Sequence, residues 1–351
     1  MLVTSVVLPG LLAGLLIRDN LYIPRSLIFM LLGMLIRLIV GAGASGDVLS
    51  FAIGVGLYSL LFGVGYELAT LGHRPLGVHG VSLAGAGAVA MGLLGWGLLA
   101  LFGLRPLDAA LIALAAVPTS AGIAAGVLRT MAKEPGQLLP EVVKAAVADD
   151  IIGLGILAAL PLIARSVGLN PISGLVALVA AVVLSALALV AMERRTRHAP
   201  LLAVALTVAA MVAGVSPGLA GVFSGYLLSG AKQLLASRVA RGSLRALPAL
   251  FFTGSGYLLD LRALGTLSTL EAIGLLLAAL AFSRGVIALL ARGSSRHRAG
   301  VGAGMAPRGE VTIALAIGLE PLIGTGGFAI LIGLVLSSTL AAVAIFAPKR
   351  L

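Results

Sequence analysis

Long, uninterrupted apolar runs constrain this chain more than any other feature of its sequence. Of its 351 residues, 60% are apolar and 11% are charged, and the mean hydropathy is +1.15. A helix needs about 20 apolar residues to cross a bilayer, and lipid admits only helices and closed barrels. Because the runs are continuous rather than alternating, they predict helices. We therefore expect an all-α polytopic membrane protein, and we exclude a soluble enzyme, a disordered chain and a nucleic-acid binder.

Thirteen apolar runs fill the chain, which matches roughly 27 residues for each helix with its loop. They lie at about 2–17, 24–40, 48–70, 77–103, 107–130, 141–164, 171–192, 200–215, 217–232, 245–261, 268–291, 299–322 and 325–347. The first run lacks the basic segment and the cleavage site of a signal peptide, so we interpret it as a span. We expect residues 1–351 to form one membrane unit without a soluble domain.

Basic residues are concentrated in alternate gaps between the runs. One set of gaps carries 17 Lys and Arg residues, and the other set carries 3. The positive-inside rule makes the first set cytoplasmic. This predicts an N-terminus outside and a C-terminus inside, as an odd number of spans requires. The net charge of +11 therefore reflects orientation in a membrane. The chain has no cysteine, which excludes thiolate metal sites and disulfides.

Two runs are interrupted by proline and glycine at corresponding places. The run at 107–130 contains Pro118-Thr119-Ser120, and the run at 299–322 contains Pro307-Arg308-Gly309-Glu310. Proline removes a backbone donor and breaks a helix. The two runs are seven spans apart, so they enter the membrane from opposite sides. Such a pair predicts an inverted-topology repeat with two unwound crossing helices at a transporter's central site. The alternative is a pair of ordinary proline kinks.

Adjacent carboxylates, Asp149 and Asp150, interrupt the run at 141–164. A charge within a spanning helix costs roughly 3 kcal/mol on insertion scales. Asp149 lies about 12 Å along the helix from Glu141, and Arg284 lies about 12 Å from Arg292, at about 1.5 Å per residue. Opposite charges at one depth predict an ion pair between Arg284 and the aspartates.

The two aspartates point about 100° apart on a helix. One can pair with Arg284 while the other faces a water-filled cavity. A carboxylate in such a place can hold either a proton or a small hard cation. We therefore predict that Asp150 and Asp149 bind the transported monovalent cation and the proton. The alternative is a salt bridge that only fixes helix packing.

Polar residues at the two interruptions extend the candidate site. The hydroxyls of Thr119 and Ser120, with freed backbone carbonyls, are predicted cation ligands, although such hydroxyls also bond back to their own helix. Arg308 and Glu310 are expected to compensate the charge of half-helix ends rather than to contact the ion. Glu67, near the inner end of the run at 48–70, is a candidate for a cytoplasmic funnel, or else a satisfied interface carboxylate.

These motifs resemble the monovalent cation:proton antiporter superfamily, and most closely the prokaryotic two-aspartate sodium/proton antiporters. The resemblance covers almost the whole chain. It rests on Ala148-Asp149-Asp150-Ile-Ile-Gly-Leu, on the two proline segments, on Phe251-Phe252-Thr-Gly-Ser-Gly-Tyr-Leu-Leu-Asp260-Leu and on Gly65-Tyr66-Glu67.

The resemblance implies an ion-binding core beside a dimerisation domain. We assign the core to residues 48–164 and 245–322, and the dimerisation helices to 1–40, 171–232 and 325–347. It also implies a homodimer in the inner membrane of a prokaryotic cell. The protein is then not an enzyme and needs no cofactor beyond the transported Na⁺ and H⁺. We expect neither a nucleic-acid partner nor the nucleotide-binding domain of the family's potassium-efflux branch.

The expected function is exchange of Na⁺, and also Li⁺, for H⁺ by alternating access. Many electrogenic members of the superfamily carry lysine where this sequence has Arg284. Arginine does not release its proton, so we expect one proton per cation and electroneutral exchange. The alternatives are K⁺/H⁺ antiport, Na⁺-coupled symport of an organic anion, and a passive channel. An intramembrane aspartyl protease is disfavoured because Asp149 and Asp150 diverge from one helix.

Overall fold

The computed structural model describes most of the chain outside its central third. The described residues are 2–17, 24–41, 47–71, 77–131, 138–146, 148–150, 152–153, 221, 224–225 and 238–346. The runs expected at 171–192 and 200–215, and most of the run at 217–232, lie outside them. The chain divides into two compact units, and each is described on its own. The first comprises Met1–Arg18, Phe29–Pro75 and Leu157–Leu258, and the second Asp19–Ile28, Leu76–Ile156 and Leu259–Leu351.

The described residues form helices joined by short turns, as the apolar runs predicted. Three of these helices are long and apolar enough to cross a bilayer, namely His79–Leu101, Leu267–Leu290 and Glu310–Phe346. Shorter apolar helices lie at Val6–Leu16, Val48–Gly63 and Pro106–Ala115. The predicted class of a helical membrane protein is thus confirmed. The count of thirteen spans and the orientation stay predictions.

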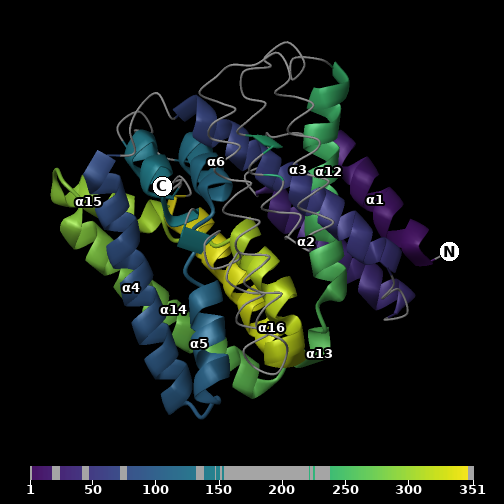
Figure 1. Ribbon diagram of the computed structural model, residues 1–351. Helices are drawn as coiled ribbons and strands as arrows, with labels where there is room; N and C mark the ends of the chain where they lie inside the picture. Colours follow the sequence, from purple (N-terminus) through teal and green to yellow (C-terminus); the bar gives the residue numbers. More distant parts are fainter. Residues whose placement is uncertain are drawn as a thin grey trace, which may run out of the picture. The chain divides into compact units, whose positions relative to one another are not determined.

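The described helices of the first unit pack closely. They are α1 (Leu2–Leu16), α3 (Asp47–Leu71), α12 (Arg238–Leu258) and most of α2 (Arg25–Val40). α12 packs against both α1 and α3 (Figure 1). Glycines permit the approach of α2 to α12: a Cβ on Gly33 would overlap the carbonyl of Thr253, and one on Gly256 would overlap that of Met30. Small residues of this kind let helix backbones meet in a membrane, where lipid supplies no hydrophobic drive.

The C-terminal ends of α2 and α12 satisfy each other's backbone groups. Arg37 donates from Nη1 to the carbonyls of Tyr257 and Leu258, at 2.8 and 3.0 Å. In return the Tyr257 hydroxyl donates to the carbonyl of Gly41 at 2.8 Å. Carbonyls at a helix C-terminus have no intrahelical donor and need such partners.

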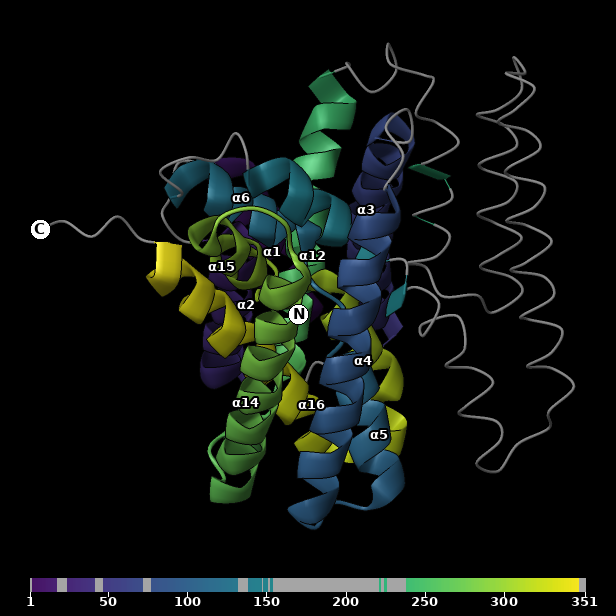
Figure 2. The ribbon, with the colours of Figure 1, turned by 90° about the vertical axis from the view of Figure 1, so that its left-hand side faces the viewer.

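The second unit contains the remaining helices that the structure describes. They are α4 (Gly77–Leu101), α5 (Pro106–Ala115), α6 (Ala121–Met131), α13 (Leu261–Leu264), α14 (Leu267–Leu290), α15 (Ser295–Gly304) and α16 (Glu310–Phe346). A further helix, here called the aspartate helix, passes through residues 138–146, 148–150 and 152–153. α14 packs against α4, α15 and α16, and α5 packs against α4 and α16 (Figure 2).

α16 changes direction within its length at Gly324. Its φ is +67° and its ψ is 179°, a conformation that glycine adopts without the steric cost of a Cβ. The two apolar runs expected at 299–322 and 325–347 meet at this residue. A glycine at the turn therefore accounts for the predicted boundary between them.

The compact units group some helices differently from the expected core and dimerisation domains. α3 and most of α12 were assigned to the core but belong to the first unit, with α1. The C-terminal part of α16 belongs to the second unit, although residues 325–347 were assigned to dimerisation. α3 and α12 pack against each other and against α1. The ion-binding and dimerisation roles stay predictions.

Candidate functional site

Two helix breaks cross inside the second unit. The first break, residues 116–120, separates α5 from α6, and the second break, residues 305–309, separates α15 from α16. Both are buried throughout. The N–H of Ser120 donates to the carbonyl of Pro307 at 2.9 Å, and the Thr312 hydroxyl donates to the carbonyl of Pro118 at 3.3 Å. α6 and α15 lie at one end of this unit and α5 at the other (Figure 1), so the chain passes the crossing in opposite directions.

Proline and glycine explain why the chain breaks and how the breaks approach. Pro118 and Pro307 each stand three residues before a new helix begins. Proline lacks an N–H and disfavours helical geometry in the residue before it. A Cβ on Gly309 would lie 2.5 Å from the Cβ of Ser120. A side chain at position 309 would therefore separate the two breaks.

Ser120 joins the beginnings of two half-helices. Its Oγ accepts a hydrogen bond from the N–H of Ile123 at 3.1 Å and donates to Oε2 of Glu310 at 2.6 Å. Ser120 is thus the N-cap of α6, and Glu310 is the first residue of α16. A carboxylate at this place is stabilised by the positive ends of helix dipoles. Glu310 was predicted to compensate the charge of a half-helix end, and its negative charge suits the positive N-terminal end. A role of Glu310 in transport stays a prediction.

Asp149 forms hydrogen bonds with Thr119 of the first break. It is 1% exposed, and its Oδ2 accepts hydrogen bonds from the N–H and the hydroxyl of Thr119, at 3.0 and 2.5 Å. Arg308 Nη1 lies 3.7 Å from the same oxygen. Gly153, one turn further on the aspartate helix, lets this helix approach Pro118, because a Cβ there would overlap the proline ring. Asp150 follows Asp149 and is fully buried.

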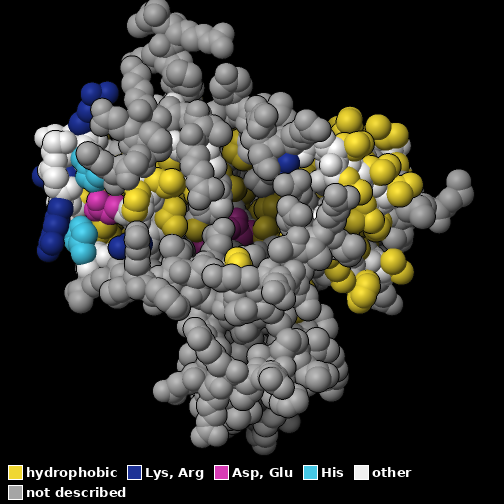
Figure 3. Space-filling model, turned by 90° about the horizontal axis from the view of Figure 1, so that it is seen from above, with side chains coloured by type: hydrophobic (Ala, Val, Ile, Leu, Met, Phe, Trp, Pro, Cys, Tyr) yellow, Lys and Arg dark blue, Asp and Glu magenta, His cyan; other side chains and the backbone are white. Residues whose placement is uncertain are grey.

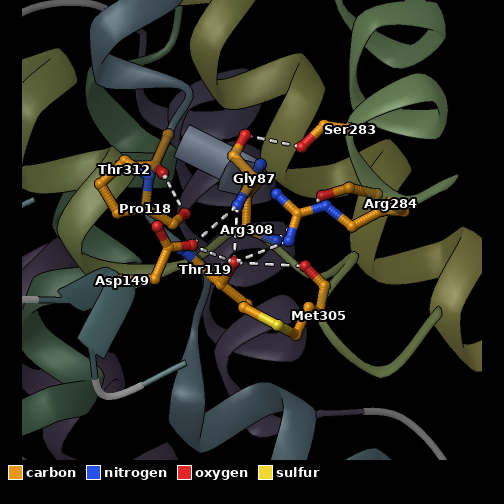
Figure 4. A network of polar contacts seen from close by, with 10 residues as sticks. Gly87, Pro118, Thr119, Asp149, Ser283, Arg284, Met305, Arg308 and Thr312 are labelled. Atoms are coloured by element: carbon orange, nitrogen blue, oxygen red, sulfur yellow. Dashed lines mark hydrogen bonds and ion pairs between the residues drawn. The ribbon is translucent and has the colours of Figure 1, made fainter. Parts of the chain in front are cut away.

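The Thr119 hydroxyl is the centre of the polar network (Figure 4). Arg308 donates to it from Nη1 at 2.8 Å, and Arg284 donates from Nη1 at 3.3 Å. The carbonyl of Met305 lies 3.2 Å from the same hydroxyl. The structure thus brings together four predicted site residues, Asp149, Thr119, Arg284 and Arg308, from four separate elements. Direct cation contact by the hydroxyls of Thr119 and Ser120 stays a prediction.

The ion pair predicted between Arg284 and the aspartates stays a prediction, and the structure places a second arginine beside Asp149. Arg308 is the arginine within ion-pair distance of Asp149, and Arg284 reaches this carboxylate through Thr119. Arg308 extends from the second break, which crosses directly over Thr119. Arg284 comes from α14, where its neighbour Ser283 donates to the carbonyl of Gly87 in α4 at 2.8 Å.

Two further residues hold Arg308 in place and were missed in the sequence. Ser338 accepts a hydrogen bond from the backbone N–H of Arg308 at 3.1 Å. Thr339 donates from its hydroxyl to the carbonyl of Arg308 at 3.3 Å. The signal that was available is the run of three hydroxyl residues, Ser337 to Thr339, in an otherwise apolar segment.

The described residues include five charged side chains that are fully buried. They are Asp149, Asp150, Arg284, Arg308 and Glu310, with exposures between 0% and 6%. All five belong to the second unit. Their formal charges sum to −1 when every group is ionised. Glu67 lies in α3, in the first unit, and its side chain lies outside the described part of the structure.

A second ionisable cluster joins three helices of the same unit. Glu141 of the aspartate helix contacts His297 of α15, with Nε2 and Oε2 2.8 Å apart, and His79 of α4, with Nε2 and Oε1 3.5 Å apart. Two histidine patches flank an acidic patch in the view from above (Figure 3). The partner role of His297 was not predicted, because 156 positions separate it from Glu141.

Comparisons with known proteins identify the family and the fold. The family model for the sodium/hydrogen exchanger, transmembrane, matches residues 6–348. Among solved structures, the sodium proton antiporter MjNhaP1 from Methanocaldococcus jannaschii at pH 8 is similar, with a TM-score of 0.67 and 17% identity. The alignment covers 98% of this chain and 95% of that one. At this identity the likeness shows a shared fold. A comparison with curated proteins finds no match.

Proposed function

The chain belongs to the sodium/hydrogen exchanger family, and from that premise we propose that it exchanges Na⁺ or Li⁺ for H⁺ across a membrane. The cation and the proton compete for Asp150. The observation that carries this proposal is the set of five buried charges beside two crossing helix breaks. Family resemblance further supports a homodimer in the inner membrane of a prokaryote.

The neighbouring aspartates take different roles in this proposal. Asp149 Oδ2 already receives two hydrogen bonds from Thr119 and the charge of Arg308. We therefore assign Asp149 to the fixed part of the site. Asp150 is buried at the next position and points about 100° away on the helix. A carboxylate oxygen suits either a proton or a hard cation, so one group can serve both ions in alternation.

The formal charge of the buried cluster supports electroneutral exchange. The five groups sum to −1 when all are ionised. Binding one proton or one monovalent cation brings the sum to zero, so both loaded forms are neutral. Neither arginine can supply a second proton, because a guanidinium stays protonated in proteins. One cation is therefore exchanged for one proton.

Proteoliposomes with an acid interior test this proposal. NaCl, LiCl and KCl are added in turn while a dye reports the internal pH. We expect Na⁺ and Li⁺ to dissipate the gradient in the wild type and not in Asp150→Asn. Asp108→Asn is the matched control, since this carboxylate pairs with the exposed Arg105 at 2.7 Å.

The same assay separates the alternatives. A larger response to KCl than to NaCl identifies a K⁺/H⁺ antiporter. Equal responses from the wild type and Asp150→Asn contradict the assignment of Asp150. A wild type that responds to none of the three cations contradicts antiport and favours Na⁺-coupled uptake of an organic anion.

A further inference from the structure

We propose that the corner between α14 and α15, residues 291–298, binds the phosphate group of an anionic phospholipid through Arg292 and Arg296. This inference goes beyond ion exchange and does not depend on it, because it concerns an exposed corner of the second unit rather than the buried charges.

The end of α14 places this corner beside the lipid headgroups. α14 is long and apolar enough to cross a bilayer. Its 24 residues extend about 36 Å, against about 30 Å for the hydrocarbon core. In its last turn Leu289 is 72% exposed and Leu290 is 49% exposed, as side chains that face acyl chains are. The residues that directly follow Leu290 therefore lie where the hydrocarbon ends and the charged headgroups begin.

The corner is strongly basic, with three arginines and no carboxylate. Arg292 and Arg296 are exposed, and no ion pair or hydrogen bond joins either guanidinium to the part of the chain that the structure describes. Glu141 contacts His297 of this corner, and it also contacts His79. Basic side chains lie beside the histidine patches in the view from above (Figure 3). Two positive charges are thus available to an external anion.

The third arginine of the corner holds it against α14. Arg298 donates from Nε to the carbonyl of Ala288 and from Nη2 to that of Leu289, both at 2.9 Å. Carbonyls at a helix C-terminus lack intrahelical donors and need such partners. Arg298 is therefore a cap of α14 rather than a lipid ligand.

Two glycines let the chain turn back closely over α14. Gly293 has a φ of +105°, a conformation that residues with a Cβ rarely adopt. A Cβ on Gly302 would lie 2.5 Å from the carbonyl oxygen of Arg284, so the backbones of α15 and α14 meet there. The two exposed arginines therefore extend from a backbone that is already held in place. Binding a lipid then costs little further ordering of the backbone.

A phospholipid fits this corner better than a soluble anion does. Guanidinium groups bind phosphate through two parallel N–H bonds, and a soluble phosphate offers the same chemistry. A phospholipid also has acyl chains, which can lie against the exposed Leu289 and Leu290 while its phosphate meets the arginines. The basic pattern of the sequence predicts that this gap is cytoplasmic, on the side where anionic lipids are abundant. The continuity of apolar and basic surface therefore favours the lipid.

A fluorophore on the corner reports a lipid that is bound there. The chain has no cysteine, so Ser295→Cys, at an exposed position between the two arginines, gives a single labelling site. The labelled full-length protein is delipidated in detergent and titrated with spin-labelled phosphatidylglycerol or spin-labelled phosphatidylcholine. Quenching of the fluorophore measures binding at this corner and requires no transport.

We expect phosphatidylglycerol to quench at about 25-fold lower concentration than phosphatidylcholine, because the attraction of each arginine to an anionic headgroup is worth about fivefold. Arg292→Gln and Arg296→Gln should each lower this preference about fivefold, and the double variant should remove it. Arg105→Gln in the labelled protein is the matched control, since Arg105 is an exposed arginine outside the corner that pairs with Asp108. This control should keep the full preference.

Equal quenching by the two lipids without the arginine substitutions, or a preference that survives in the double variant, overturns the inference. Inorganic phosphate, added at constant ionic strength, separates a lipid from a soluble anion. We expect it to leave quenching by phosphatidylglycerol unchanged, and displacement of the lipid by phosphate overturns the assignment to a membrane lipid. A preference for phosphatidylglycerol that the double variant loses supports the inference even if the protein carries out no exchange.

Discussion

Thr119 donates both its backbone N–H and its hydroxyl to one oxygen of Asp149, at 3.0 and 2.5 Å. In a continuous helix this N–H would bond to the carbonyl four residues earlier, within α5. The break at Pro118 frees the donor, and an aspartate of another helix uses it. The helix break and the buried carboxylate therefore stabilise each other.

The two aspartates should respond differently to neutralisation. Asp149→Asn removes the charge beside Arg308 and should destabilise the protein by about 3–5 kcal/mol, as breaking a buried ion pair does. Asp150→Asn should abolish exchange, because an amide cannot bind a proton or a cation as the carboxylate does. Melting curves in detergent check the first expectation and the dye assay checks the second. A melting temperature of Asp149→Asn equal to that of the wild type would contradict the fixed role of Asp149.

Gly309 should tolerate no side chain. A Cβ at this position lies 2.5 Å from the Cβ of Ser120, so Gly309→Ala should push the breaks apart. We expect a loss of about 1–3 kcal/mol in stability, which is usual for overpacking, together with slower exchange. Gly285→Ala is the control, because a Cβ there meets nothing within 4 Å. A similar loss of stability in both variants would show that the effect does not come from the crossing.

Exchange should be insensitive to membrane potential. Moving one net charge across the membrane changes the free energy by about 2.3 kcal/mol per 100 mV. An electroneutral cycle moves none, so the initial rate should be the same with potentials of either sign. The measurement uses proteoliposomes with potentials set by a potassium ionophore, with Na⁺ as the exchanged ion. A rate that changes several-fold on reversal of the potential would show an unequal stoichiometry.

Glu141 and His297 should be energetically coupled. A double-mutant cycle with Glu141→Gln and His297→Gln should give a coupling of about 0.5–1 kcal/mol, since the pair is partly exposed. The coupling is measured from melting curves of the two single variants and the double variant. No coupling would mean that the contact contributes nothing to stability.

The sequence by itself determined the membrane class, the positions of the breaks and the buried charges. These features are local, because apolar length, proline and charge act within one helix or between neighbouring residues. The predicted pair of Pro118 and Pro307 was confirmed as two buried breaks for that reason. Burial of Asp149 and Asp150 was likewise readable from the apolar run around them.

Only the tertiary structure decided which charges meet. Thr119 forms hydrogen bonds with Asp149, Arg284 and Arg308. These residues lie 30, 165 and 189 positions away from it in the sequence. Depth along a helix predicts that opposite charges lie at one level, but it does not say which helix faces which. The place of Arg308 beside Asp149 was therefore not predicted. Partner choice follows from the crossing of two breaks, whose geometry depends on packing between elements far apart in the chain.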